Sequence, residues 1–286
     1  MSIDYDHLMA IEIPDVHQQY TGRDTMLYAL SLGLGQDPTN SRHLPFVYES
    51  GQKCLPTYGT TLGHPGFWLK DMDTGVDWVK VVHAQQELLI HRPLPVAADI
   101  IARQKIVDVI DRGEGRGAMI IWQRSIIDAH SGDALCTINQ YMLARGDGGF
   151  GGPAKTLVNA ASVPDRPADV ITTRETSAQM ALLYRLNGDW NPLHADPEVA
   201  KSAGFQRPIL HGLATWGVAA TAVVDEICNF DVSKVISVAG RFTAPVYPGE
   251  TFRIEIWVDG SEICFRVTVP ARDVVALNNG LIRLSA

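Results

Sequence analysis

The chain has 286 residues and a formal net charge of −8, a balance that argues against nucleic acid and anionic membrane surfaces as main partners, because both favour basic proteins. Hydrophobic residues make up 46% and charged residues 20%, which is typical of a globular protein with a sizeable core. The first residues show no basic segment followed by an apolar run, so we expect no secretory signal and a cytoplasmic location. Four cysteines fit no CxxC or zinc spacing and are expected to be buried free thiols: Cys54, Cys136, Cys228 and Cys264.

The first half of the chain is predicted to hold one helix followed by four strands. The helix is expected over residues 24–34, and the strands over residues 78–89, 99–110, 118–127 and 135–144. A glycine-rich segment follows at residues 146–153, with the sequence GDGGFGGP. Because such backbone has many accessible states and few side chains to bury, we interpret this segment as a linker. It separates two predicted domains, residues 1–145 and 154–286.

The second half shows a similar order of elements. A short helix is expected over residues 198–203, with Asp196 as its N-cap and Pro197 in its first turn. Residues 212–228 are helical in composition and apolar nearly all round, so this helix must be buried on every face. Four strands are expected at residues 235–244, 251–258, 262–269 and 274–284. A buried helix followed by antiparallel strands predicts a sheet wrapped around a helix, and two such units in one chain give an α+β fold.

Reactive side chains are concentrated in residues 184–216, where a glycine and a proline predict irregular backbone around Asp189, Asn191 and His194. An Asp and a His within reach of one water can share proton removal and proton delivery, which typically accelerates a reaction about 10²–10⁴-fold. A structural interpretation stays open beside this one. In it, Asp189 and Asn191 cap turns and His194 is a half-buried histidine with a satisfied hydrogen bond.

A metal site built from His194, Asp196 and His211 is a third interpretation, although no two of these residues have the i, i+4 spacing of many histidine sites. Gly212 lies at or near the first turn of the apolar helix, where free N–H groups point outward at the positive end of the helix dipole. A glycine there lets a ligand oxygen approach the backbone closely. Removing one such oxyanion donor typically costs about 2.7–4 kcal/mol of transition-state stabilisation. An acid–base pair beside this donor predicts chemistry next to a thioester carbonyl.

The motif Tyr184-x-x-Asn187-Gly188-Asp189-x-Asn191-Pro192-Leu193-His194, followed by Pro208-Ile209-Leu210-His211-Gly212-Leu213, resembles the type 2, (R)-specific enoyl-CoA hydratases of the MaoC-like family. Further similar segments are Arg241-Phe242 and residues 245–251, 55–58 and 83–95, so the resemblance covers nearly the whole chain. The family more often has Ser or Thr where this chain has Asn187. That position neighbours the catalytic Asp and is not itself catalytic.

The resemblance implies two hotdog units, each an antiparallel sheet wrapped around a central helix, and hydration of trans-2-enoyl-CoA to (3R)-3-hydroxyacyl-CoA. Asp189 and His194 would hold the catalytic water, and Asn191 would help to place substrate or water. The Gly212 N–H would receive the thioester oxygen. The pocket would also include Tyr184 and His211.

No metal and no separate cofactor is implied by the resemblance, because coenzyme A arrives as part of the acyl-CoA substrate. It also implies a role in fatty acid metabolism and beta-oxidation, and a possible homodimer. Only the second half carries the Gly-Asp-x-Asn-Pro-x-His motif, so the first half would accommodate the acyl chain.

Two other functions compete with hydration. A hotdog thioesterase would direct water at the thioester carbonyl, and a non-catalytic subunit would bind acyl-CoA without reaction. The joint presence of Asp189, His194 and Gly212 favours the hydratase over both. The sequence does not determine the type of acyl group, the direction of the reaction in the cell, or which of Asp189 and His194 takes the first proton.

Overall fold

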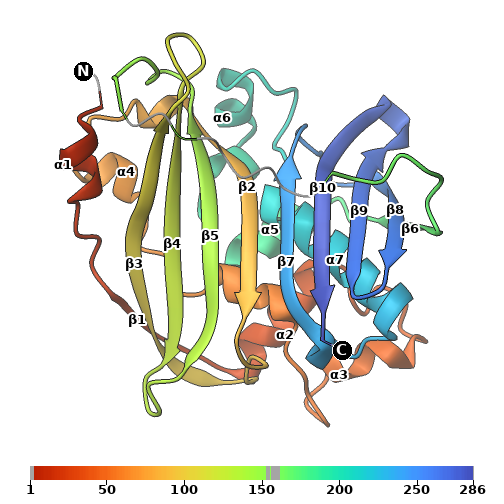
Figure 1. Cartoon of the computed structure of the whole chain (residues 1–286). Helices are drawn as coiled ribbons and strands as arrows, with labels where there is room; N and C mark the ends of the chain where they lie inside the picture. Colours follow the sequence, from red (N-terminus) through yellow and green to blue (C-terminus); the bar gives the residue numbers. More distant parts are fainter. Residues whose placement is uncertain (1–2, 153–154, 156–161, 286) are drawn as a thin grey trace.

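A computed structural model describes residues 3–152, 155 and 162–285, so residue 153 of the predicted linker and residue 154 of the predicted second domain lie outside the described residues. The fold is one antiparallel sheet of ten strands, in the order β1-β3-β4-β5-β2-β7-β10-β9-β8-β6, with helices on its inner side (Figure 1). In the described residues, no helix combines the length and apolar composition needed to cross a membrane.

The first half supplies one side of the sheet. Its strands are β1 (Val16–Tyr20), β2 (Val81–Ile90), β3 (Ala98–Asp111), β4 (Ala118–Asp128) and β5 (Ala134–Ala144). Its helices are α1 (Tyr5–Met9), α2 (Gly22–Ser31), α3 (Leu44–Val47) and α4 (Trp68–Asp71), with the 3-10 segments η1 (Ser41–His43), η2 (Pro56–Thr61) and η3 (Trp78–Lys80). Within the described residues, this half has no helix longer than α2, and the short η2 segment contacts the strands β2 and β5.

The second half supplies the other side. Its strands are β6 (Val170–Glu175), β7 (Val235–Phe242), β8 (Thr251–Asp259), β9 (Glu262–Val269) and β10 (Val274–Leu284). Its helices are α5 (Met180–Tyr184), α6 (Pro197–Ser202) and α7 (Gly212–Cys228), with the 3-10 segments η4 (Arg185–Asn187), η5 (Pro192–His194), η6 (Val232–Lys234) and η7 (Pro270–Arg272). The strands of this half wrap around α7, which contacts all five of them (Figure 1).

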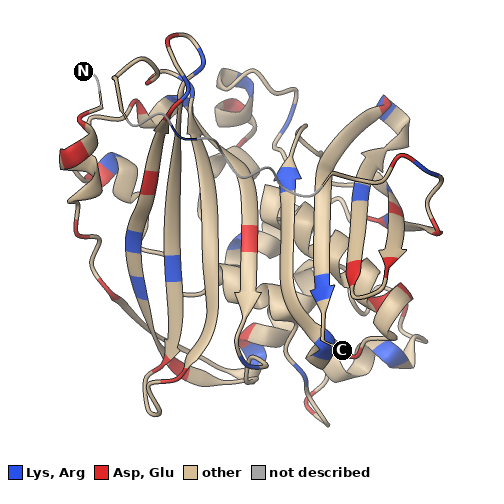
Figure 2. Ribbon diagram, viewed as in Figure 1, with Lys and Arg blue, Asp and Glu red and all other residues tan. Residues whose placement is uncertain are grey.

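The two halves join edge to edge, because β2 pairs with β7 in an antiparallel register that places Gln86 opposite Gly240. Helix α7 is buried along most of its length, with Trp216 fully enclosed. In the view of Figure 2, Lys and Arg are interspersed with Asp and Glu over both halves, without a face of one sign. This distribution agrees with the acidic, mixed composition of the chain.

The predicted elements are confirmed with small shifts at their ends. Helix α7 spans the predicted residues 212–228, and strands β9 and β10 also have the predicted bounds. Helix α2 begins two residues earlier than predicted, at Gly22, because Thr21 and Asp24 form a capping box at its start. The strands β1 and β6 were not predicted. The α+β class with antiparallel sheets is confirmed, and the exact domain boundaries stay a prediction.

Candidate active site

The loop between α5 and α7 carries the predicted reactive residues on a backbone fixed by local contacts. Gly188 ends η4 in the left-handed region, with φ of 111°, which an L side chain rarely adopts. The Asp196 carboxylate caps α6 by accepting hydrogen bonds from the N–H groups of Glu198 and Val199, as predicted. The residues between these points, including η5, are therefore held at both ends.

Asp189 and Asn191 make the turn-capping contacts that the structural interpretation of these residues predicts. The Asp189 carboxylate accepts a hydrogen bond from the Asn191 N–H at 3.2 Å, and the Asn191 side chain accepts one from the Leu193 N–H at 3.0 Å. Each contact uses only part of the acceptor capacity of its side chain. Asp189 is exposed, so its remaining lone pairs are open to a ligand.

His194 is oriented by a backbone contact. Its Nδ1 lies 2.8 Å from the carbonyl oxygen of Ile209, so Nδ1 carries the proton and donates it to that carbonyl. Burial lowers the pKa of the His194 imidazole, whereas the charge of Asp189 and the bond to Ile209 raise it. The ring is therefore neutral with its proton on Nδ1, and the lone pair on Nε2 can accept a proton.

His211 lies directly against His194. Their rings stack with centroids 3.6 Å apart and planes at 26°. The Tyr184 ring also packs against His211, with ring centroids 4.8 Å apart. Burial lowers the pKa of His211 to about 2, and neither of its ring nitrogens has a hydrogen-bond partner among the described residues. His211 is therefore neutral, and it fixes the plane of His194 by packing.

One ligand atom each from Asp189, His194 and His211 lies within 4.8 Å of the others, which is the spacing of a possible metal site. The stacking argues against a good fit. Two nearly parallel rings direct their in-plane lone pairs side by side, whereas a tetrahedral ion requires them to converge. The predicted metal set differs as well, because the Asp196 carboxylate caps α6 and is not part of this group.

Gly212 is the first residue of α7, directly after the N-cap residue His211. In the described part of the chain its N–H donates no hydrogen bond, as expected for the first turn of a helix. A Cβ atom at Gly212 would lie 3.2 Å from the Phe242 ring. Gly212 therefore packs closely against the Phe242 ring at the start of α7.

Two histidines of the first half face the same region, and the sequence did not single them out as site residues. Burial lowers the pKa of His64 to about 3 and that of His83 to about 4, and in both cases the charge of Asp189 acts in the opposite direction. His83 packs against Phe242 with ring centroids 4.8 Å apart. His64 is exposed to solvent, and its ring stands edge-on to Trp122 with centroids 5.4 Å apart.

The charge of Asp189 acts on both histidines, so residues of the two halves lie close together here. About 100 residues separate His83 from Asp189 in the sequence, so no local motif connects them. Of the six predicted site residues, Asp189, His194 and His211 are grouped, Tyr184 packs on His211 and Gly212 follows it, whereas the Asn191 side chain accepts a hydrogen bond from the Leu193 N–H.

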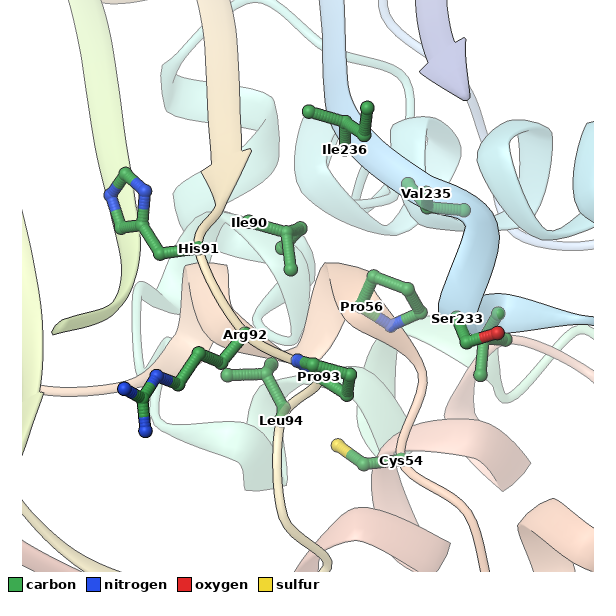
Figure 3. A pocket seen from close by; sticks show the side chains of 11 residues that line it. Cys54, Pro56, Ile90, His91, Arg92, Pro93, Leu94, Ser233, Val235 and Ile236 are labelled. Atoms are coloured by element: carbon green, nitrogen blue, oxygen red, sulfur yellow. The ribbon is translucent and has the colours of Figure 1, made fainter. Parts of the chain in front are cut away.

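A different cavity of about 150 Å³ lies at the far end of β2, where this strand meets the start of β7 (Figure 3). Figure 3 shows His91 and Arg92 after β2, Cys54 beside Pro56, and Val235 and Ile236 on β7 around it. None of the six predicted site residues lines this cavity. It is separate from the cluster around His194.

Comparison with known proteins matches both halves. The MFE-2 hydratase 2 N-terminal domain matches residues 18–146, and the MaoC like domain matches residues 159–279. Enoyl-CoA hydratase ChsH3 of Mycobacterium tuberculosis is 36% identical over 293 residues, which cover 98% of each chain. The peroxisomal multifunctional enzyme type 2 of mouse is 36% identical over 282 residues, which cover 96% of this chain and 37% of the mouse enzyme. Among solved structures, a MaoC-like dehydratase from Phytophthora capsici superposes with a TM-score of 0.85 at 28% identity and 98% coverage of each chain.

Proposed function

The chain belongs to the MaoC-like family of type 2 enoyl-CoA hydratases and is an enzyme of the hydro-lyase kind, and from this we propose that it hydrates trans-2-enoyl-CoA to (3R)-3-hydroxyacyl-CoA with Asp189 and His194. The observation that carries the proposal is the grouping of the Asp189 carboxylate with the His194 ring, whose tautomer is set by Ile209. The mycobacterial relative is named an enoyl-CoA hydratase, which supports enoyl-CoA as the substrate class.

Asp189 and the His194 Nε2 are both hydrogen-bond acceptors, so one water can donate a hydrogen to each. Removal of one of these protons makes the water oxygen nucleophilic, and the oxygen bonds to the β-carbon of the enoyl group. The π electrons move toward the thioester, and a proton is then delivered to the α-carbon. Because two coupled groups share these proton transfers, they titrate as a pair.

The Gly212 N–H is proposed to receive the thioester oxygen. Negative charge develops on that oxygen when the nucleophile adds to the β-carbon, and a free N–H at the positive end of α7 stabilises it. Gly212 directly follows His211, which stacks on His194. The donor and the proton-transfer pair are therefore close enough to act on one conjugated group.

The acyl chain is proposed to be accommodated by the first half of the chain. The second half is filled by the long buried helix α7, whereas the described helices of the first half are short. The charge of Asp189 acts on His64 and His83 of the first half. The first half thus contributes walls of the substrate site and no residue of the proton-transfer pair.

A direct test is to incubate the purified protein with short and long trans-2-enoyl-CoA and to follow the loss of enoyl-thioester absorbance, with chiral analysis of the product. Asp189→Asn and His194→Gln should each lower kcat by about 10²–10⁴-fold, the range for loss of acid–base catalysis. Asp196→Asn is a matched control, because this carboxylate caps α6 and lies outside the grouped ligand atoms.

Each other result has a defined meaning. Release of free coenzyme A in place of hydration would favour a thioesterase. Tight binding of acyl-CoA without turnover, across short, long and bulky acyl groups, would favour a non-catalytic binding subunit. Full activity of both pair variants would refute the assignment of Asp189 and His194.

A cytoplasmic location, a role in beta-oxidation and a homodimer stay predictions, as does the absence of a separate cofactor. Relatives with peroxisomal names exist, so location is a property to be measured for this chain. Fractionation of cells and the molecular mass in solution are the measurements that decide these points.

A further inference from the structure

The segment that carries Asp189 is attached to the first half of the chain by one side chain. The Nδ2 amide group of Asn187 donates hydrogen bonds to the Ser31 hydroxyl at 3.1 Å and to the carbonyl oxygen of Tyr184 at 2.9 Å. Ser31 is the last residue of α2, so the first of these bonds joins residues that are 156 positions apart. In the part of the chain that the structure describes, it is the one side-chain hydrogen bond between residues 185–194 and the first half.

Both partners of this bond are oriented by their surroundings. Ser31 is 0% exposed, and its hydroxyl donates its single proton to the carbonyl oxygen of Tyr28 at 2.7 Å. The Ser31 oxygen is therefore an acceptor for Asn187. The carbonyl oxygen of Tyr184 can only accept, which fixes the orientation of the Asn187 amide. Asn187 is half-buried, and α2 contacts both α5 and η4 here (Figure 1), so the bond belongs to a packed boundary between the halves.

A single glycine separates Asn187 from Asp189. Gly188 has φ of 111°, and a Cβ atom built on it would meet no atom of the described residues within 4 Å beyond its own neighbours. Asp189 is exposed as well. Packing therefore contributes little to the position of the Asp189 backbone. The amide of Asn187 is the last anchored side chain before the carboxylate.

His194 is anchored in a different way, within the second half alone. Its Nδ1 donates to the carbonyl oxygen of Ile209, and its ring stacks on His211 directly before α7. The two members of the proton-transfer pair therefore have different supports. His194 is held by the elements next to α7, whereas the segment before Asp189 is held by α2 of the first half.

The distance between the two members depends on both supports. The Asn191 N–H donates to one oxygen of the Asp189 carboxylate at 3.2 Å, which holds that oxygen near η5 but leaves the Asp189 backbone dependent on the contact with α2. A water that bridges Asp189 and His194 requires both acceptors within hydrogen-bond reach. A misplacement of about 1 Å can lower the rate of a reaction about 10²-fold, so a small shift of Asp189 is sufficient to impair the pair.

We propose that Asn187 is a positioning residue for the hydration: its bond to Ser31 sets the place of the Asp189 carboxylate relative to the His194 ring. The helix α2 of the first half thereby determines the geometry of a proton-transfer pair that lies entirely in the second half. This inference rests on the proposed function of Asp189 and His194. Asn187 acts through Asp189 and not on the substrate, so its removal should change kcat and leave KM nearly unchanged.

The test removes the two ends of the bond separately and together. Asn187→Leu has a similar size, no donors and no change of charge, and it should lower kcat by about 10- to 100-fold with KM within about twofold. Ser31→Ala removes only the acceptor at the end of α2, and it should lower kcat by about 3- to 10-fold. The double variant should resemble Asn187→Leu, because the second change removes a bond that is already lost.

The pKa of His194 is a readout that a loss of stability alone does not move. The charge of Asp189 raises this pKa, so a displaced carboxylate raises it less. NMR titration of His194, with its signal assigned from the His194→Gln variant, should show a lower pKa in Asn187→Leu. The acidic limb of the pH profile of kcat should move to lower pH in the same variant.

Asn139→Leu is the matched control. The Asn139 amide donates to the Glu87 carboxylate at 2.8 Å and accepts from Gln123 at 2.9 Å. It is half-buried like Asn187 and lies on the side of β5 opposite the buried Ile138. This variant loses hydrogen bonds of the same kind, and it should keep both kcat per folded molecule and the pKa of His194.

The outcomes separate positioning from stability. An unchanged kcat in folded Asn187→Leu, losses that multiply in the double variant, or an equal loss in Asn139→Leu would each overturn the proposal. If the unchanged protein hydrates no enoyl-CoA, the NMR titration still decides. A lower pKa of His194 in Asn187→Leu would then support the positioning of Asp189 while the proposed function fails, and an unchanged pKa would overturn the positioning role as well.

Discussion

Substitution of Gly212 by Ala distinguishes an effect on the proposed oxyanion donor from an effect on the stability of helix α7. The new methyl group would lie 3.2 and 3.3 Å from two ring atoms of Phe242, which is tight by a few tenths of an ångström. The ring can move by that amount, and Ala is favoured over Gly in a helix by up to about 1 kcal/mol. We therefore expect the free energy of unfolding to change by less than about 1 kcal/mol.

Activity should respond much more strongly to the same change. The methyl group and the displaced Phe242 ring change the packing at Gly212, whose N–H is the proposed donor to the thioester oxygen. Loss of one oxyanion donor typically costs about 2.7–4 kcal/mol in the transition state, which corresponds to about 10²–10³-fold in kcat. Gly212→Ala should thus be a folded protein with a large defect in hydration.

Gly217→Ala on the same helix is the control, because it should lower stability and leave kcat per folded molecule unchanged. A Cβ atom there would lie 3.0 Å from both terminal carbons of Leu32 and 3.1 Å from the Tyr28 hydroxyl, all from α2 and the residue after it. Overpacking of this kind typically costs about 1–3 kcal/mol. We expect a lower unfolding temperature and a kcat per folded molecule close to that of the unchanged protein.

The assay measures kcat and KM with one trans-2-enoyl-CoA and the unfolding transition in urea for all three proteins. Comparable stability of Gly212→Ala together with a large loss of kcat would support the donor role. An unaltered kcat in a folded Gly212→Ala protein would refute it. A loss of activity that only follows the loss of stability would place Gly212 in the fold and not in the chemistry.

Two further predictions concern buried groups. The pKa values of His83 and His211 are lowered by burial to about 4 and about 2, whereas an unfolded histidine titrates near 6.5. Between pH 6.5 and 4 the unfolded chain therefore binds more protons, and the free energy of unfolding should fall with decreasing pH by about 1.4 kcal/mol per pH unit for each such group. Urea unfolding across this range checks the slope, and an identical slope in His211→Phe would contradict it. Tyr184→Phe should raise the free energy of unfolding by about 1 kcal/mol, since the buried hydroxyl has no hydrogen-bond partner among the described residues; destabilisation in thermal unfolding would show that this hydroxyl donates to the Thr60 oxygen, which can still accept.

The elements with strong periodic patterns were predictable from the sequence. Residues 212–228 form α7 with the predicted bounds, because a helix that is apolar on every face has only one stable environment. Strand β8 alternates apolar and charged residues, as in Phe252 to Ile256, and its bounds agree within one residue. The short strands β1 and β6 were missed because they contain few apolar residues and receive their stability from pairing with β3 and β8.

The candidate site was predictable only where it is local in sequence. Asp189 and His194 are five residues apart, and the backbone around them is held by turn and cap contacts. Gly188, Asp196 and Pro197 predict these contacts from the sequence. The approach of His64 and His83 to Asp189 depends on the pairing of β2 with β7. No pattern within a short window contains that information. Cross-strand neighbours such as Gln104 and Arg124 were hidden for the same reason, since they meet only when β3 and β4 are in register.

The two halves differ in what packs against the inner face of their sheet, and this difference is consistent with different roles in the proposed reaction. A strand face that packs against a long apolar helix must itself be apolar, and the strands around α7 follow this rule with buried side chains such as Phe252, Phe265 and Val267. The first-half sheet faces shorter elements, so its inner face is free to carry Arg124 and Gln86. Under the proposed function, the half packed around α7 holds Asp189 and His194, and we expect substitutions on the inner face of the other half to change the accepted acyl group without moving that pair.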